Sequence, residues 1–441
     1  MEQTFMKERK ILPLVLAMSL PMVISMAVNS LYNIIDSYFI AKVSEDAMTA
    51  LALVYPVQNL INAIAIGFGV GLNAVIAFYL GAGEQEQADK AATLGTFLSF
   101  IHGILLMVVC IVGMPLFLKN FSSDQQITDL ALIYSGRAFL FSPVINVGLS
   151  FEKIFQSIGK MKVSMFSMIC GCAANIILDP IMIFGIGVFP AMGITGAAYA
   201  TGIGQCITLL VYLFCYLFRP NSIKIHKKHL CFDFMVIKKI YSIGISATLN
   251  LALPSLLISV LNGLLAEFSE KYVLVLGVYY KLQTFIYLTA NGIIQGIRPL
   301  MGYNFGAGEY GRVKKIYITS LTMNVGIMMI GMILSWTIPE HLIGLFTDNL
   351  QTIKIGVSAL HVISLGFMVS AVTITCSGAL EGLGKGIHSL FLSFLRYVAI
   401  IIPAAYIFSR FWGSDGVWYS FCFTEFVTAC FAGLIYRKAL R

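Results

Sequence analysis

The sequence has few charged residues. Only 11% of its 441 residues are Asp, Glu, Lys or Arg, whereas 58% are hydrophobic and the mean hydropathy is +0.86. A typical soluble domain carries about 25% charged residues, and these cover its surface. The composition therefore excludes a soluble globular protein, and most of the molecular surface is expected to face lipid.

The sequence also lacks the motifs of the common enzyme classes. Neither an HExxH pattern, a GxSxG pattern nor a phosphate loop occurs, and the 6 His are dispersed. Cys170 and Cys172 have neither the spacing of a redox pair nor that of a zinc cluster. No basic groove with interleaved aromatic residues accompanies the net charge of +8. We therefore expect a protein that is not an enzyme, has no cofactor and binds no nucleic acid.

Long apolar stretches recur along the whole chain. Each is long enough to cross a hydrocarbon core about 30 Å thick as a helix. The sequence therefore predicts an all-α membrane protein with about twelve transmembrane helices. The predicted spans are 13–40, 48–80, 91–117, 127–155, 162–186, 193–218, 240–266, 272–305, 315–338, 350–380, 387–410 and 415–436.

Lys and Arg are distributed unevenly among the segments that connect these spans. About 20 lie on the side of the amino terminus and about 5 on the opposite side, and basic loops stay in the cytoplasm. The basic start runs into a full-length span without a cleavage signature, so the first helix is expected to be retained. We predict a multi-pass protein of the cell (plasma or inner) membrane with both termini in the cytoplasm.

Two motifs repeat with the same shift of 225 positions. Gly81-Ala82-Gly83-Glu84 returns at Gly306, and Gly159-Lys160 returns at Gly384-Lys385. A shared shift indicates a duplicated unit, and an even number of spans in each half makes the two repeats parallel. We predict an amino-terminal six-helix lobe at 1–218, a basic cytoplasmic connector at 219–239 and a carboxy-terminal six-helix lobe at 240–441, with the substrate path between the lobes.

A polar stripe follows one face of the first predicted span. Its members are three or four positions apart, which places them on one side of a helix. They are Ser25, Asn29, Tyr32, Asn33 and Asp36. The stripe ends in a carboxylate, and an acid within a membrane is a candidate functional residue.

A second acid lies in the fifth span. Asp179 has Asn175 one turn before it and Pro180 directly after it, so an amide and a carboxylate share a face beside a proline. Together with Asp36 they offer several oxygen ligands to one small cation. The residues fit Na⁺, which needs a cage of oxygens, and they equally fit a proton, which needs one buried carboxylate.

Other interpretations of the charged residues stay open. Asp36 and Asp179 are alternatively hydrogen-bonded packing residues, or Asp36 pairs with a base on another helix such as Arg137. Glu152 and Glu425 are expected close to the membrane–water interfaces, where an ionised residue costs little. For these two residues a structural or gating role is preferred. The bases of the second half either line the cavity or lock the lobes together by pairing, and pairing is preferred. These bases are Lys281, Arg298 and Arg396.

Beyond these single residues, the chain resembles multidrug and toxic compound extrusion (MATE) transporters along essentially its whole length. The glycine turns and the duplicated six-helix layout contribute to the resemblance. Its further motifs are Asn175-Ile-Ile-Leu-Asp179-Pro180, Gly196-Ala-Ala-Tyr-Ala-Thr201 and Tyr303-Asn304-Phe305-Gly306-Ala307.

The resemblance implies a V-shaped pair of six-helix bundles related by a pseudo-twofold axis. It further implies a secondary active multidrug efflux antiporter that exports small amphiphilic organic cations in exchange for Na⁺ or H⁺. The chain is most similar to the prokaryotic DinF-type branch. The NorM-type branch places acids in the seventh and tenth helices, whose cores contain none here, so a second cation site in the carboxy-terminal lobe is not expected. We expect the protein to be a monomer in the lipid bilayer.

The DinF-type pattern implies a coupling site in the amino-terminal lobe. Its cation-binding positions fall on Asp36, Asn175, Asp179 and Thr201. Pro21 matches the first-helix proline at which bending is proposed to follow cation binding, and Tyr32 and Tyr134 match tyrosines near the site. With Asn29 and Asn33 of the polar stripe, these three residues are predicted to line the cavity or to take part in gating.

Two other classes of protein are alternatives. A flippase for lipid-linked saccharides has a related architecture, but it is expected to have about fourteen spans and a cationic cavity for phosphate. An intramembrane enzyme or a receptor is the other alternative, and for this class no catalytic constellation is visible in the sequence.

Overall fold

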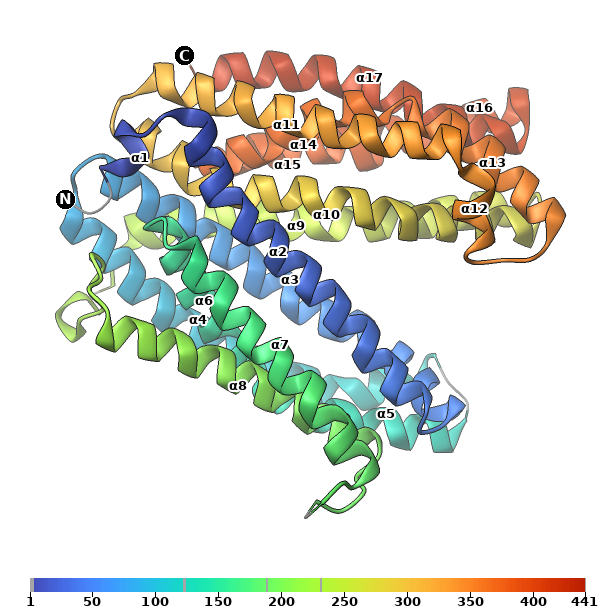
Figure 1. The fold of residues 1–441 in the computed structure, drawn as a ribbon, viewed down its shortest axis with the longest axis horizontal. Helices are drawn as coiled ribbons and strands as arrows, with labels where there is room; N and C mark the ends of the chain where they lie inside the picture. The colour runs from blue at the N-terminus through green and yellow to red at the C-terminus, as the bar shows by residue number, and fades with distance from the viewer. Residues whose placement is uncertain (1–3, 122–123, 188, 231, 441) are drawn as a thin grey trace. The chain divides into compact units, whose positions relative to one another are not determined.

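The computed structural model describes residues 4–121, 124–187, 189–230 and 232–440. Every regular element in these ranges is helical (Figure 1). The first half contains α1 (Phe5–Glu8), α2 (Ile11–Ala41), α3 (Glu45–Gly81), α4 (Gln85–Lys119), α5 (Gln125–Ala138), η1 (Phe139–Phe141), α6 (Ser142–Ser157), α7 (Met161–Phe184), α8 (Ile194–Phe218) and η2 (Lys227–His229). The second half contains α9 (Phe234–Ala266), α10 (Glu270–Gly306), α11 (Tyr310–Thr337), α12 (Pro339–Gly344), α13 (Leu350–Ser364), α14 (Phe367–Gly382), α15 (Gly386–Phe394), η3 (Leu395–Ile400), α16 (Ile401–Trp412) and α17 (Ser414–Ala439).

The predicted number of membrane spans is confirmed. In the described ranges, 11 helices are long and apolar enough to cross a membrane, and a twelfth span forms if the bent pair of α13 and α14 counts as one. The bend between these two helices is 56°. The segments α5–η1–α6 and α15–η3–α16 each correspond to one predicted span, so the boundaries taken from apolar runs agree with the helices within a few residues at most ends.

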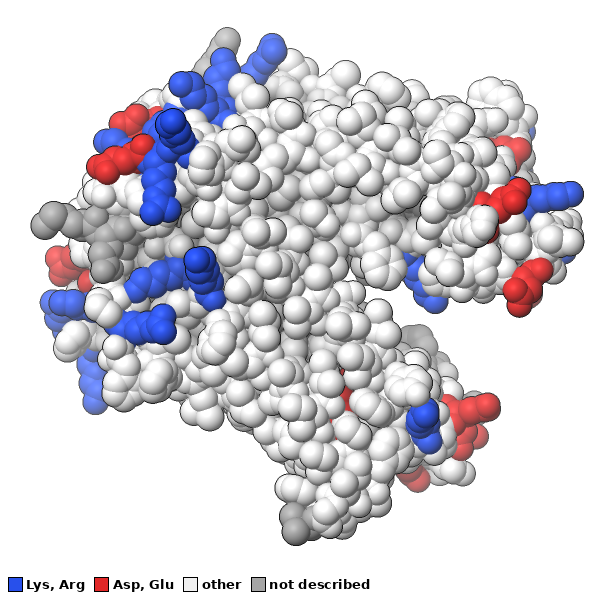
Figure 2. Space-filling view, in the orientation of Figure 1, with Lys and Arg blue, Asp and Glu red and all other residues white. Residues whose placement is uncertain are grey.

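Charged side chains avoid the middle of the helices. On the face drawn in Figure 2, the surface between the helix ends is mostly uncharged, and Lys and Arg predominate at one end. This distribution is the one that a lipid environment requires, because an ionised group in hydrocarbon is costly. The protein is therefore a multi-pass membrane protein.

The chain divides into two compact units. One contains residues 24–244, and the other contains residues 4–23 together with 245–441. The amino-terminal part of α2 thus packs with the second unit, whereas α9 contributes residues 234–244 to the first. The predicted lobes at 1–218 and 240–441 and the connector at 219–239 stay a prediction, from which these units differ mainly at α2.

The repeated glycine motifs form repeated turns. Gly83 and Gly308 have φ values of 79° and 73°, and Gly159 and Gly384 have values of 79° and 75°. In this left-handed region a side chain is strained, so glycine is favoured. After each glycine, the next backbone N–H donates to the carbonyl five residues before it, a pattern that ends helices in a Schellman motif. The donors and acceptors are Glu84 to Tyr79, Lys160 to Phe155, Glu309 to Asn304 and Lys385 to Leu380.

Two further glycines with the same shift let helices approach closely. A Cβ at Gly71 of α3 would lie 2.2 Å from the carbonyl oxygen of Ile240 in α9. A Cβ at Gly296 of α10 would lie 2.6 Å from Ser19 Cα in α2. Small residues at such crossings allow backbone contact between membrane helices. Each unit therefore has a glycine that allows close contact with the first half of a long helix, α9 in the first unit and α2 in the second.

The two units also fill one equivalent position in opposite ways. In the first unit, the missing side chain of Gly69 makes room for Lys153, whose Cγ would lie 2.8 Å from a Cβ there. The position 225 residues after Gly69 is Ile294, and the position 225 residues after Lys153 is Gly378. A Cβ at Gly378 would lie 2.2 Å from Ile294 Cγ2. The large and small partners have therefore exchanged places.

Replacing Gly378 with Leu is expected to lower the thermal unfolding temperature, because overpacking of a filled site costs about 1–3 kcal/mol. Adding Ile294→Ala should restore much of the loss, since it removes the clashing methyl groups. Thermal unfolding of the detergent-purified variants measures both effects. Gly326→Ala is the control, because no atom lies within 4 Å of a Cβ at that position. A double variant no more stable than Gly378→Leu would contradict the size exchange.

Candidate functional site

Both intramembrane acids singled out from the sequence lie in one place within the first unit. Asp36 comes from the second half of α2, Asp179 and Asn175 from α7, and Thr201 from α8. Asp179, Asn175 and Asp36 are buried, with exposed fractions of 0%, 2% and 8%. Thr201 is half-buried. The four residues predicted to bind a cation therefore come from three helices that pack together.

Glycines set the spacing of α7 and α8 near this site. A Cβ at Gly171 would lie 1.8 Å from Thr208 Oγ1, and a Cβ at Gly204 would lie 2.8 Å from the carbonyl oxygen of Gly171. The same Cβ at Gly204 would approach Asn175 Cβ to 3.1 Å. Only a helix pair without side chains at these two positions packs this closely. The close approach puts Asn175 within reach of Thr201 on the neighbouring helix.

Hydrogen bonds connect the site residues. Asn175 Nδ2 donates to Asp179 Oδ1 at 3.3 Å and to Thr201 Oγ1 at 3.4 Å. The carboxyl groups of Asp36 and Asp179 lie within hydrogen-bonding reach of each other. A hydrogen bond between two carboxyl groups requires that one of them carries a proton. The two acids therefore form a pair that can share one proton.

Several oxygen atoms of the site have no hydrogen-bond donor among the described residues. They are Asp36 Oδ1, Asp179 Oδ2 and Asn175 Oδ1, each of which is shielded from solvent. Buried polar atoms normally have a partner, so three unsatisfied acceptors in one place are unusual. Oxygen atoms of carboxylates and amides are the ligands that hard cations prefer. The arrangement fits a small cation or a proton.

No base neutralises this pair in the part of the chain that the structure describes. Its five ion pairs include neither Asp36 nor Asp179. The alternative in which Asp36 pairs with Arg137 is wrong, because Arg137 Nη1 donates to the carbonyl of Ile133 at 2.9 Å. Two ionised carboxylates in contact in a low dielectric repel each other strongly. A proton or a cation at the pair would relieve this repulsion.

Two tyrosines lie close to the acids. The hydroxyl of Tyr32 is within hydrogen-bonding reach of Thr201, and Tyr134 of α5 is 2% exposed. Gln58 of α3 donates to Tyr134 Oη at 3.3 Å. Gln58 was not predicted as part of this region. Gln58 is one of four amide side chains in the predicted span 48–80, with Asn59, Asn62 and Asn73, and nothing in its spacing relates it to the acids.

The remaining predicted residues are two exposed asparagines and one buried proline of α2, and their role in the cavity or in gating stays a prediction. Asn29 and Asn33 are exposed, and Asn33 Nδ2 donates to the carbonyl of Asn29 at 2.7 Å. Pro21 is buried in the part of α2 that packs with the second unit. The predicted polar stripe therefore divides, with Ser25 and Asp36 buried and both asparagines exposed.

The acids of the second unit are neutralised by bases. Arg298 Nη2 lies 2.6 Å from Glu381 Oε2, and Arg396 Nε donates to Glu425 Oε1 at 2.9 Å. The two arginines pair with acids, as preferred, but both pairs lie within the second unit, so they do not lock one lobe to the other. Lys281 instead lies over the ring of Phe346, with 5.5 Å between its Nζ and the ring centroid.

The partners of Glu152 favour the structural role predicted for this residue. Its Oε1 lies 2.7 Å from Lys153 Nζ, and it also accepts a hydrogen bond from Gln156 Nε2 at 2.7 Å. Glu152 and Lys153 are both buried.

No group of three or more His, Cys, Asp or Glu suited to a metal ion was found within the described ranges. The first-unit acid pair is therefore the site with the clearest functional chemistry.

Duplicated bundles of membrane helices around buried ionisable residues are typical of secondary transporters. This is the class that the fold and the site define. The sequence profile of the MatE family matches residues 21–181 and 247–407, two segments with nearly the same shift as the repeated motifs. The chain belongs to the MatE family, and the expected family is confirmed.

Relatives and solved structures agree with this assignment. The chain is 27% identical over 419 residues to the multidrug export protein MepA of Staphylococcus aureus, an alignment that covers 95% of this chain and 91% of MepA. MepA of Staphylococcus saprophyticus is 24% identical, with the same coverage. An outward-facing multidrug resistance MATE family transporter of the MOP superfamily has the same fold, with a TM-score of 0.93, 23% identity and coverage of 100% of this chain and 98% of that chain.

Removing one charge should change the thermal unfolding temperature in opposite directions for the two kinds of pair, the like-charged pair of Asp36 and Asp179 and the oppositely charged pair of Arg396 and Glu425. Asp36→Asn and Asp179→Asn are each expected to raise the thermal unfolding temperature in sodium-free buffer at pH 9, because each removes repulsion between two acids. Glu425→Gln is expected to lower it, because the change leaves the charge of Arg396 uncompensated, at a cost of about 3 kcal/mol. Thermal unfolding in detergent measures all three. Destabilisation by both Asp variants would show that the acid pair holds the fold.

Proposed function

We propose that the chain is a secondary active multidrug efflux antiporter that exports small organic cations in exchange for Na⁺ or H⁺. The observation that carries the proposal is the buried pair of Asp36 and Asp179, which has no base among the described residues and leaves two carboxylate oxygens unsatisfied beside the unsatisfied Oδ1 of Asn175. A packing role alone gives no reason to retain two acids in contact inside a membrane. The relatives named above are multidrug export proteins, which supports the same conclusion.

The coupling ion would bind at Asp36, Asn175, Asp179 and Thr201. A sodium ion would use carboxylate, amide and hydroxyl oxygens, whereas a proton would need only one carboxyl group of the pair. Asn175 suits either ion, because its amide holds Asp179 and Thr201 together and keeps one oxygen available. The assignment to the DinF-type branch remains part of this proposal.

Charge provides the physical link between ion and substrate. With neither ion nor proton bound, two negative charges attract an organic cation into the first unit. Binding of Na⁺ or H⁺ neutralises one of them, weakens that attraction and favours one packing of α2, which carries Asp36. The coupling is reciprocal, so a bound organic cation lowers the affinity for the ion by the same factor, and a tenfold effect corresponds to about 1.4 kcal/mol. Pro21 is the proposed position at which α2 bends.

The second unit is not proposed to bind a coupling ion. Its buried acids Glu381 and Glu425 are paired with Arg298 and Arg396, so neither offers an uncompensated charge. A flippase for lipid-linked saccharides is less well supported, because the unpaired buried charges are acidic and would repel phosphate. We further propose that the protein is a monomer of the cell membrane with both termini in the cytoplasm, as the distribution of Lys and Arg predicts.

Reconstitution into liposomes tests the coupling. Efflux of a fluorescent organic cation, followed under separately imposed sodium and proton gradients, is expected to respond to one of the two. Asp36→Asn should abolish the gradient-driven component, because a neutral amide does not exchange between ionised and neutralised forms. Asp179→Asn should have the same effect, whereas Asn175→Ala should weaken ion dependence about tenfold by removing one ligand.

Asp129→Asn is the matched control for these variants. Asp129 lies on α5 of the same unit but is exposed, so efflux should stay at the parental level. Full ion-dependent efflux by Asp36→Asn would refute the proposed site. Absence of efflux under both gradients, with transfer of a lipid-linked saccharide instead, would favour the flippase.

A further inference from the structure

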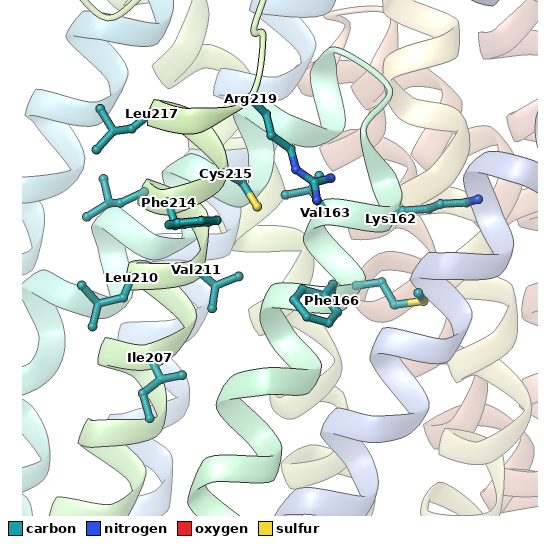
Figure 3. Close-up of a pocket in the computed structure, with 12 residues that line it drawn as sticks. Lys162, Val163, Phe166, Ile207, Leu210, Val211, Phe214, Cys215, Leu217 and Arg219 are labelled. Carbon is teal, nitrogen blue, oxygen red and sulfur yellow. The ribbon is translucent and has the colours of Figure 1, made fainter.

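We propose that the outward-facing groove between α7 and α8 binds one anionic phospholipid, with an acyl chain between the helices and the phosphate at Lys162 and Arg219. The groove lies at the ends of these helices opposite to Asp179 and Thr201 (Figure 3). Its volume is about 930 Å³. The proposal concerns a lipid site and does not depend on which ion or substrate is transported.

The wall of the groove is apolar and faces outward. Phe166 of α7 is 58% exposed, and on α8 Leu210, Phe214 and Leu217 are 62%, 58% and 71% exposed. Side chains of this kind at a membrane-facing surface contact lipid rather than water. Because they line a groove rather than a flat surface, one acyl chain would be held by both helices.

The groove is closed on its inner side. Tyr212 of α8 is 1% exposed and donates from its hydroxyl to the carbonyl of Ser164 in α7 at 3.4 Å. Its ring stacks on Phe155 of α6, with 5.8 Å between centroids. Farther along, the Gly171–Gly204 contact holds the two helices together. The groove lining ends at Phe166 on α7 and at Ile207 on α8, before the glycine contact, so a chain in the groove would enter from the lipid side.

The depth of the groove matches one leaflet of a bilayer. Its lining on α8 runs from Ile207 to Leu217. Ten residues of helix rise about 15 Å. This is half of a hydrocarbon core about 30 Å thick. A lipid with its chain in the groove would thus have its phosphate at the level of Arg219.

Two bases lie at this level without an acidic partner. Neither Lys162 nor Arg219 takes part in an ion pair within the described ranges. In Figure 3, the Arg219 side chain reaches from the end of α8 toward Val163 of α7, whereas Lys162 extends away from α8. Neighbouring Lys160 differs, since its Nζ donates to Asn221 Oδ1 at 2.9 Å. Arg219 therefore lies over the mouth of the groove, and Lys162, on the far side of α7, would have to turn toward it to contact the same phosphate.

The combination of an apolar wall and two bases selects the ligand class. An exported organic cation would be repelled by Lys162 and Arg219, and an anion without chains would leave the apolar wall unused. An anionic phospholipid satisfies both parts. Each Lys or Arg near an anionic lipid surface contributes about 1 kcal/mol, so two bases correspond to a preference of roughly thirtyfold at most.

Native mass spectrometry of the full chain in detergent tests the site. Dioleoylphosphatidylglycerol and dioleoylphosphatidylcholine are titrated separately, and the affinity for the first bound lipid is measured. The parent should prefer phosphatidylglycerol about tenfold. Lys162→Ala with Arg219→Ala should abolish the preference, and Lys162→Arg with Arg219→Lys should keep it. Val211→Trp, which fills the groove, should weaken the first binding event for both lipids.

Lys314→Ala with Lys315→Ala is the matched control. It removes two exposed bases from the start of α11, where no groove residue lies. The preference for phosphatidylglycerol should persist in this variant. The proposal is refuted if this control loses the preference as fully as the groove variant does, since the effect would then be diffuse surface charge. An unchanged preference in the Lys162 and Arg219 variant would refute it as well.

Discussion

Every ionised side chain between the ends of these helices must be neutralised within the protein, because hydrocarbon offers neither water nor counterions. Most of the buried acids meet this constraint with a base. Glu152 lies against Lys153, Glu381 against Arg298 and Glu425 against Arg396. Asp36 and Asp179 differ, because no described ion pair includes them and their carboxyl groups lie within hydrogen-bonding reach of each other. In the proposed function, the charge that neutralises the pair comes from solution, which would couple the pair to an ion gradient.

The duplicated halves solve the same neutralisation problem with different residues. Gln156 in the first unit corresponds to Glu381 in the second, and Asn73 corresponds to Arg298, at the shift of 225. The base lies at Lys153 in one unit, and its counterpart in the other is Gly378. Each half thus keeps one base and one acid in the network, although the positions have changed and Arg298 is only half-buried. The acid pair has no counterpart, because the positions 225 residues after Asp36 and Asp179 are Leu261 and Ala404.

The sequence predicted the membrane spans because apolar length is a local property that a bilayer selects directly. It also placed Asp36 and Asp179 together, since acids are so few inside spans that each is informative, and the family resemblance added Asn175 and Thr201. The sequence alone could not predict which charged residues pair over a long separation. Arg298 and Glu381, for example, lie 83 positions apart, and no periodicity connects them. Gln58 was missed for the same reason. The packing of the first part of α2 with the second unit depends on Gly296 meeting Ser19, a contact that only the folded chain shows.

Asp179 and Thr201 lie at the ends of α7 and α8 that are opposite to the proposed lipid groove. Between these two places, Gly171 and Gly204 allow the backbones of α7 and α8 to contact each other. On the groove side of this contact, larger side chains line the space between the two helices. A bound chain changes an equilibrium only if it binds two conformations with different affinity. The groove is closed on its inner side by Tyr212, so a change in helix separation there would alter the width available to a chain. If the separation of α7 and α8 changes when Asp179 gains or loses its ion, lipid and ion binding are coupled through the glycine contact. If it does not, the lipid stabilises the first unit without affecting exchange.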